Sequence, residues 1–127
     1  MILFLLFLSS AILAQTGKQN LLITHLTGDY YIFTSYHLYK NNLASANGMY
    51  LVTNKGVVMF DTPWDTTQFQ PLLDSIKKKH GKNVILCIAT HSHEDRTAGL
   101  EFLKEHGVAT FTSSLTDQIS KKQNQKR

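Results

Sequence analysis

The fold of this chain is decided by the stretch Val84-Ile85-Leu86-Cys87-Ile88-Ala89-Thr90-His91-Ser92-His93-Glu94-Asp95-Arg96. Residues 84–90 form a continuous apolar run, which is typical of a buried strand. Two imidazoles and a carboxylate follow at i, i+2 and i+4, from His91, His93 and Asp95. A strand that ends in such a cluster presents it at the rim of a sheet. The stretch therefore predicts an α/β fold with a metal site at the end of a strand.

The chemistry of these three side chains favours zinc. Neutral imidazole is a good zinc ligand, and a carboxylate adds a harder, anionic one. Side chains alternate along an extended backbone, so we expect His91 and His93 to point the same way and to bind one metal. Asp95 lies past the predicted strand end, on a turn, and would reach a neighbouring position. Zinc lowers the pKa of a bound water to about 7, which supplies a hydroxide nucleophile. A solvated polar loop is the alternative interpretation of the motif.

Toward the N-terminus, the sequence predicts a β-meander. Aromatic and β-branched residues indicate the strands, and clusters rich in Asn, Gly and Ser indicate the turns. The predicted strands are residues 21–23, 29–36, 49–53 and 57–60. The predicted turns are residues 40–42, 45–48 and 54–56.

A helix is predicted between the meander and the apolar strand. Its apolar face, at i, i+3, i+4 and i+7, consists of Phe69, Leu72, Leu73 and Ile76. Thr67 and Gln70 fit a capping box at its start, and Gly81 fits a stop. After the His motif, the sequence predicts a helix over 97–106, a strand over 108–112 and a third helix from Ser114. Helices alternating with strands indicate helices layered on a mixed sheet.

Length and charge limit the possible functions. The 127 residues suffice for one domain or part of one, and the formal net charge is +4. Four positive charges gather near the end of the chain, on Lys121, Lys122, Lys126 and Arg127, and the formal charge of the rest is zero. The excess positive charge therefore lies at the end of the chain. Nucleic-acid-binding proteins instead carry a basic face with interleaved aromatic residues. We therefore expect no nucleic-acid partner.

The first 14 residues predict export. Met1–Ala14 is apolar and uncharged, and it is shorter than the ~20 residues that span a bilayer. Leu13-Ala14-Gln15 resembles a signal-peptidase site. We expect a periplasmic protein whose domain covers residues 15–127, with no membrane attachment after cleavage; an uncleaved helix or anchor is the alternative. The single cysteine, Cys87, forms no internal disulfide and is expected to be a small buried hydrophobe.

The motif from His91 to Arg96 resembles the His-x-His-x-Asp-Arg signature of subclass B1 metallo-β-lactamases. Residues 47–53, 55–58 and 61–64 resemble that subclass in the same order and with similar spacing. The resemblance covers nearly the whole chain from Leu21 onward. It implies a metallo-β-lactamase αββα sandwich, of which this chain carries the N-terminal half. Glyoxalase II and the RNase Z type usually have a histidine where Arg96 stands, so this position separates the chain from them.

The family resemblance also implies roles for individual residues. His91 and His93 would bind the first of two zinc ions, and Asp95 would bind the second and act in catalysis by helping to hold the attacking hydroxide. Asp61 would be a buried acid that supports the ligand loop, and Arg96 would tune the second zinc site electrostatically.

Substrate contacts are implied for the segment before the motif. Residues 36–47 correspond to a flexible hairpin that closes over the β-lactam. His37 lies in that hairpin and Trp64 matches a residue on the wall near the site, so both are candidate substrate-binding residues. The implied substrate is a small β-lactam antibiotic, and the implied activity is hydrolysis of its ring, which confers resistance.

The remaining zinc ligands of the family lie downstream of the motif, and none has a counterpart before Arg127. We therefore expect an incomplete domain, truncated at its C-terminus, and a 127-residue polypeptide that alone is inactive and poorly folded. The family implies a monomer. Two alternatives stay open: another hydrolase of this fold, such as a lactonase or thioesterase, or a non-catalytic truncated product.

Overall fold

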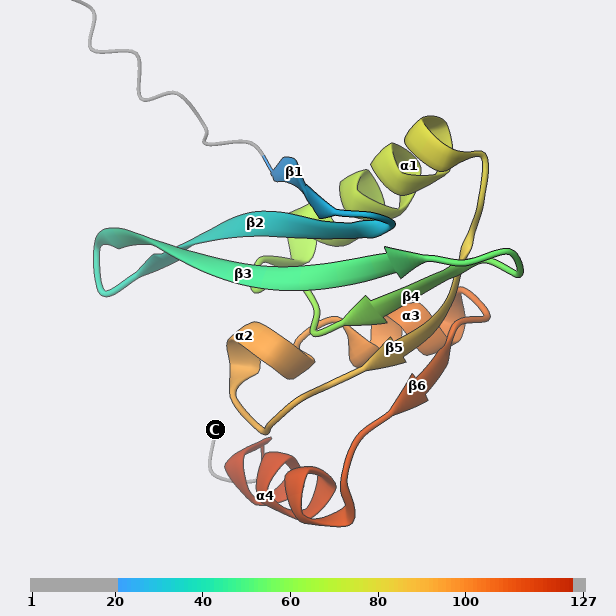
Figure 1. Ribbon diagram of the computed structural model, residues 1–127. Coiled ribbons are helices and arrows are strands. Elements are labelled where there is room, and N and C mark those ends of the chain that lie inside the picture. The colour runs from blue at the N-terminus through green and yellow to red at the C-terminus, as the bar shows by residue number, and fades with distance from the viewer. Residues whose placement is uncertain (1–20, 125–127) are drawn as a thin grey trace, which may run out of the picture.

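A six-stranded sheet forms the centre of the molecule, and its strands lie side by side in the order in which they occur in the sequence (Figure 1). The computed structural model describes residues 21–124. Strands β1 to β4 pair antiparallel, whereas β4, β5 and β6 are parallel. The strands are β1 (Leu22–Thr27), β2 (Tyr30–Tyr39), β3 (Asn42–Val52), β4 (Val57–Phe60), β5 (Val84–Ile88) and β6 (Ala109–Phe111). The predicted signal peptide, residues 1–14, lies outside the described residues, as do Lys126 and Arg127.

The hairpin of β2 and β3 is longer than the sequence predicts. Lys40 and Asn41 form its turn with positive φ angles of 48° and 63°, so the predicted turn at 40–42 is present. The predicted turn at 45–48 is wrong, because β3 runs without interruption and pairs with β2 from Asn42 to Leu51. Cross-strand pairing outweighs the turn preference of Asn47 and Gly48.

Helix α1 (Phe69–His80) follows a 3-10 turn, η1 (Thr66–Gln68). The predicted capping box is wrong, because Asp65 caps the turn by accepting the backbone N–H of Thr67 at 2.8 Å between oxygen and nitrogen. The Gln70 side chain donates instead to Asp74 on the next turn. Gly81 ends the helix in the left-handed conformation, with φ at 66°, as predicted.

The helix predicted over 97–106 is two helices. Helix α2 (Glu94–Thr97) begins inside the His motif, and α3 (Leu100–Glu105) follows after a break at Gly99. The break arises because the N–H of Gly99 donates to the buried Thr62 hydroxyl at 3.0 Å. Local periodicity does not reveal this long-range hydrogen bond. Helix α4 (Ser114–Asn124) follows β6.

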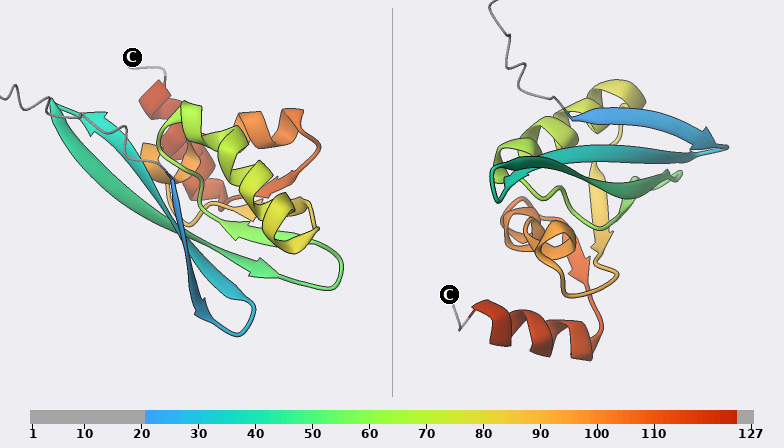
Figure 2. Two further views of the ribbon diagram at one scale, coloured as in Figure 1. Left: turned by 90° about the horizontal axis from the view of Figure 1, so that it is seen from above. Right: turned by 90° about the vertical axis from the view of Figure 1, so that its left-hand side faces the viewer.

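The hydrophobic core lies between the sheet and helices α1 and α3, which cover the same face (Figure 2). Leu72 and Ile76 of α1 and Leu103 of α3 are at most 3% exposed. They pack against sheet residues that include Val57, Met59 and Cys87. This arrangement confirms the predicted α/β class. Within residues 21–124, the structure contains no helix with the length and apolar character needed to cross a membrane.

Candidate metal centre

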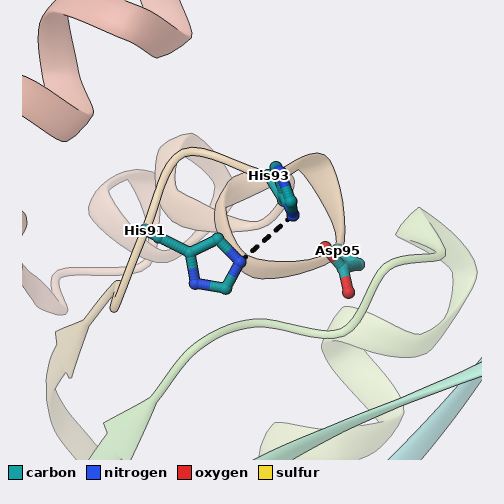
Figure 3. A group of neighbouring side chains, drawn as sticks. All are labelled: His91, His93 and Asp95. Carbon is teal, nitrogen blue, oxygen red and sulfur yellow. Dashed lines mark hydrogen bonds between the residues drawn. The ribbon is translucent and has the colours of Figure 1, made fainter.

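The three predicted ligands lie together in the segment that follows β5 (Figure 3). His91 and Ser92 form a bend, His93 precedes α2 with extended φ and ψ angles of −67° and 147°, and Asp95 lies in the first turn of α2. One ligand atom from each residue lies within 4.8 Å of the other two. The histidines follow the strand as predicted, but the predicted extended backbone is wrong at the bend of His91 and Ser92, and Asp95 is helical instead of lying on a turn. The bend and the helix start bring the side chains together.

A chain of hydrogen bonds sets the orientation of His91. The Thr90 hydroxyl lies 2.9 Å from Oδ1 of Asp61 and 3.0 Å from Nδ1 of His91. An ionised carboxylate only accepts, so the hydroxyl donates its hydrogen to Asp61 and accepts from His91. Nδ1 of His91 then carries the ring proton, which leaves the lone pair of Nε2 available for a metal.

The spacing of the two imidazoles suits a zinc ion. Nε2 of His91 and Nδ1 of His93 lie 3.2 Å apart. Two nitrogens, each 2.0–2.1 Å from a tetrahedral zinc, are roughly 3.3 Å apart. The donor set of two imidazoles and one carboxylate also matches the ligands that zinc takes in hydrolytic sites. His91, His93 and Asp95 therefore fit a zinc ion.

Asp61 supports this segment from the end of β4. Its carboxylate accepts the backbone N–H of Thr90 at 2.8 Å, and the residue is 7% exposed. Its φ angle is 66°, in the left-handed region that non-glycine residues rarely adopt. The structure thus places a buried acid against the residue before His91, where the resemblance implies one.

Arg96 connects the metal segment to two other elements. Its guanidinium lies 3.5 Å from the Asp95 carboxylate and 3.6 Å from that of Asp61, and Nη1 donates to the carbonyl oxygen of Asn47 on β3. The cation is thus shared between two acids and the hairpin strand. Its proposed tuning of a second zinc rests on the 3.5 Å pair with Asp95.

His37 and Trp64, the candidate substrate-binding residues, stack on each other with ring centroids 4.7 Å apart. Both line a cleft of about 560 Å³ that is also bordered by Ser92 and Glu94 of the metal segment and by α4. The three candidate ligands do not line this cleft. The role of His37 and Trp64 in substrate binding remains a prediction.

Four further residues position the metal segment or the elements around it, and the sequence did not single them out for this role. Thr90 orients His91, Thr62 anchors α3, and Asp65 and Gln68 contact β2. Each acts through a partner more than 25 residues away or through a neighbour whose geometry depends on the fold. The one local signal was Asp65, an acid two residues before Thr67 that could have been recognised as a cap.

Comparison with known proteins agrees with this geometry. Residues 43–113 match the profile of the Metallo-beta-lactamase superfamily. The chain belongs to this superfamily. The resemblance to subclass B1 metallo-β-lactamases is confirmed by sequence and structure together. Metallo-beta-lactamase type 2 of Elizabethkingia meningoseptica is 45% identical over 105 residues, and metallo-beta-lactamase IND-1 of Chryseobacterium indologenes is 44% identical over 92 residues.

The same relationship appears in the fold. The crystal structure of metallo-beta-lactamase IND-7 superposes with a TM-score of 0.79 and 38% sequence identity. The match covers 84% of this chain and 49% of that one. The matches to the two enzymes above cover 83% and 72% of this chain, but 42% and 38% of the relatives. The chain thus spans less than half the length of these curated relatives, and its metallo-β-lactamase α/β fold is part of theirs.

Proposed function

We propose that this chain carries part of the zinc centre of an enzyme that hydrolyses the β-lactam ring of antibiotics and so confers resistance. One observation supports the proposal most directly. Nε2 of His91 and Nδ1 of His93 face each other at 3.2 Å, with a carboxylate oxygen of Asp95 in the same cluster, in a chain of the metallo-β-lactamase superfamily. The metallo-beta-lactamase names of the relatives support the substrate class.

The roles of the residues follow from the contacts. His91 and His93 would hold a first zinc, and Asp95 would reach a second, the complete protein taking two. Bound zinc would supply Lewis acidity and a nucleophile at neutral pH. Thr90 and Asp61 keep Nδ1 of His91 protonated, and Arg96 keeps the Asp95 carboxylate in place. Asp95 is the candidate catalytic residue among the three, because it would help to hold the attacking hydroxide.

The test uses the complete gene product, expressed from its own reading frame. We expect this protein to be a monomer. We expect zinc to bind and a chromogenic cephalosporin to be hydrolysed. The variant His91→Ala should bind zinc at least about 100-fold more weakly and lose hydrolysis. His106→Ala is the matched control, because His106 is an exposed histidine that contacts Phe102 on α3. Turnover of a lactone or thioester in place of the cephalosporin would contradict the proposed substrate.

We further propose that the protein is exported to the periplasm. The apolar segment Met1–Ala14 and the Leu13-Ala14-Gln15 site support this. The mature protein recovered from a periplasmic extract should begin near Gln15 by mass spectrometry. An intact Met1 on membrane-bound protein would contradict the proposal.

A further inference from the structure

The side chain of Gln68 forms two hydrogen bonds with the backbone of one residue of the β2–β3 hairpin. The N–H of Tyr36 donates to Oε1 of Gln68 at 3.1 Å, and Nε2 of Gln68 donates to the carbonyl oxygen of Tyr36 at 3.1 Å. Gln68 is 9% exposed. The amide oxygen and the amide nitrogen of this buried side chain both bond to the backbone of Tyr36, so the pair of hydrogen bonds fixes the position of β2 relative to Gln68.

The Gln68 side chain supplies the hydrogen bonds that a neighbouring strand would otherwise make to Tyr36. Within the described residues, β1 pairs with β2 only as far as Thr34, opposite Leu22. Backbone groups alternate between the two edges of an antiparallel strand, so Tyr36 presents its N–H and C=O to the same edge as Thr34. Gln68 satisfies both groups where β1 no longer reaches. Without it, this part of β2 would be a free edge.

Two residues near Gln68 in the sequence contact the residues of β2 on either side of Tyr36. The Asp65 carboxylate lies 3.6 Å from Nδ1 of His37, and the backbone N–H of Trp64 donates to the Ser35 hydroxyl at 3.3 Å. The loop between β4 and α1 therefore contacts three consecutive residues of β2, positions 35–37. Arg96 holds the opposite strand through the carbonyl of Asn47.

Support for the hairpin decreases beyond these contacts. Ser35 is fully buried, whereas every residue from 38 to 43 is exposed. The hairpin tip extends away from the helices and from the rest of the sheet (Figure 2). Among the described residues, the contacts at positions 35–37 are therefore the last polar contacts of β2 with the loop between β4 and α1, and beyond them the Tyr39 ring packs against Trp64 with centroids 5.5 Å apart.

We propose that Gln68 is a positioning residue that fixes the base of the β2–β3 hairpin and thereby sets how tightly the hairpin closes on substrate. This inference rests on the proposed function and on the family resemblance, which implies that residues 36–47 close over the β-lactam. Gln68 acts through Tyr36 and touches none of the three candidate ligands among its hydrogen-bond partners. Its loss should loosen the hairpin and leave the metal cluster intact.

The first arm of the test measures hydrogen exchange of backbone amides in the complete gene product. Gln68→Met keeps the length of the side chain and removes both hydrogen bonds. We expect amides of residues 36–45 to exchange about tenfold faster, while those of α1 and β5 are unchanged. Gln68→Glu keeps an acceptor for the Tyr36 N–H but places a carboxylate oxygen against the Tyr36 carbonyl, so it should also increase exchange. Gln70→Met is the control, because Gln70 is exposed and bonds only within α1.

The second arm measures steady-state hydrolysis of a cephalosporin and the zinc content of each variant. In Gln68→Met we expect KM to rise about three- to tenfold, with kcat within about twofold and zinc content unchanged. A merely structural role would lower kcat, zinc content and stability together. Unchanged exchange of the hairpin, or a fall in kcat with loss of zinc, would overturn the inference. If the wild-type protein hydrolyses no β-lactam, the proposed function fails, and the exchange arm still decides whether Gln68 fixes the hairpin.

Discussion

Oδ1 of Asp61 accepts the backbone N–H of Thr90 at 2.8 Å, which joins the end of β4 to the residue that precedes His91. Because β4 and β5 are parallel, their carboxyl ends lie side by side and bring these two residues together, although 29 positions separate them in the sequence. The first candidate zinc ligand is therefore positioned by an acid from a neighbouring strand.

Replacing Asp61 should weaken zinc binding. Asp61→Asn suits the left-handed φ of 66° at this position but removes the charge beside Arg96 and an acceptor for Thr90. Since supporting groups of this kind typically contribute one to two orders of magnitude, we expect zinc affinity to fall roughly 10- to 100-fold. A competition titration with a chromogenic chelator measures this.

Asp74→Asn is the control for that titration, because Asp74 is exposed and its side chain accepts from Gln70 on α1. It should bind zinc like the wild type. Equal affinity in Asp61→Asn and Asp74→Asn would show that Asp61 does not support the metal site.

Gly48 should not tolerate a side chain. It lies opposite Phe33 in the hairpin, and a Cβ at position 48 would overlap the Phe33 ring, which is fully buried. We expect Gly48→Ala to lower the free energy of unfolding by about 1–3 kcal/mol, because the core has no room for the extra methyl group. Urea denaturation measures the loss.

A second substitution tests the cause of that loss. Phe33→Leu creates space above residue 48, so the double variant should be less destabilised than the sum of the two single variants. Ser45→Ala, at an exposed position of the same strand, should be nearly neutral. Strict additivity would mean that the ring and the glycine do not compete for space.

His80 should make the protein less stable in mild acid. Burial, helped by the neighbouring Lys79 ammonium, lowers the pKa of His80, and Asp29 partly opposes this shift. As the pH falls through the ordinary histidine pKa of about 6.5, the unfolded chain gains a proton that the folded ring resists. The free energy of unfolding therefore decreases below about pH 6.5 and levels off below the folded pKa. The C-terminal helix position alone favours the opposite shift, but burial against Tyr50 and Tyr31 outweighs it.

Urea denaturation at pH 7.5 and pH 5.5 measures this dependence. His80→Gln, which cannot be protonated in this range, should show a smaller loss of stability between the two values than the wild type. His25→Gln is the control, since His25 is exposed and bonded to the carbonyl of Gly28. The prediction is wrong if His80→Gln and the wild type lose equal stability.

Cys87 should be inert in the folded protein. Its side chain is fully buried, and burial, together with the charge of Asp61, raises the pKa of the thiol to about 12. At pH 8 about one thiol in ten thousand would then be a thiolate, the reactive form. In the complete gene product, a disulfide reagent should leave Cys87 unlabelled within minutes in buffer and label it in guanidinium, as peptide mass spectrometry would show. Rapid labelling in buffer would contradict the buried position.

The sequence by itself determined the local features of the protein. The apolar run 84–90, the His91–Arg96 motif and the amphipathic spacing of α1 each depend on neighbouring residues, so they predicted strand β5, the ligand set and the helix. The Gly81 stop and the turn at Lys40 and Asn41 followed from short-range preferences in the same way. Such local features can be predicted from the sequence because the residues that cause them lie within a few positions of one another.

Only the tertiary structure decided how these features are joined. Long-range partners, 9 to 37 positions away, determine the continuous β3, the break at Gly99, the Asp61–Thr90 contact and the hydrogen bonds between Gln68 and Tyr36. Burial makes such hydrogen bonds obligatory, because an unpaired polar group inside the protein costs about 1–3 kcal/mol. That cost exceeds the fractions of a kcal/mol by which turn and helix preferences differ, so the long-range partners prevail over the local pattern.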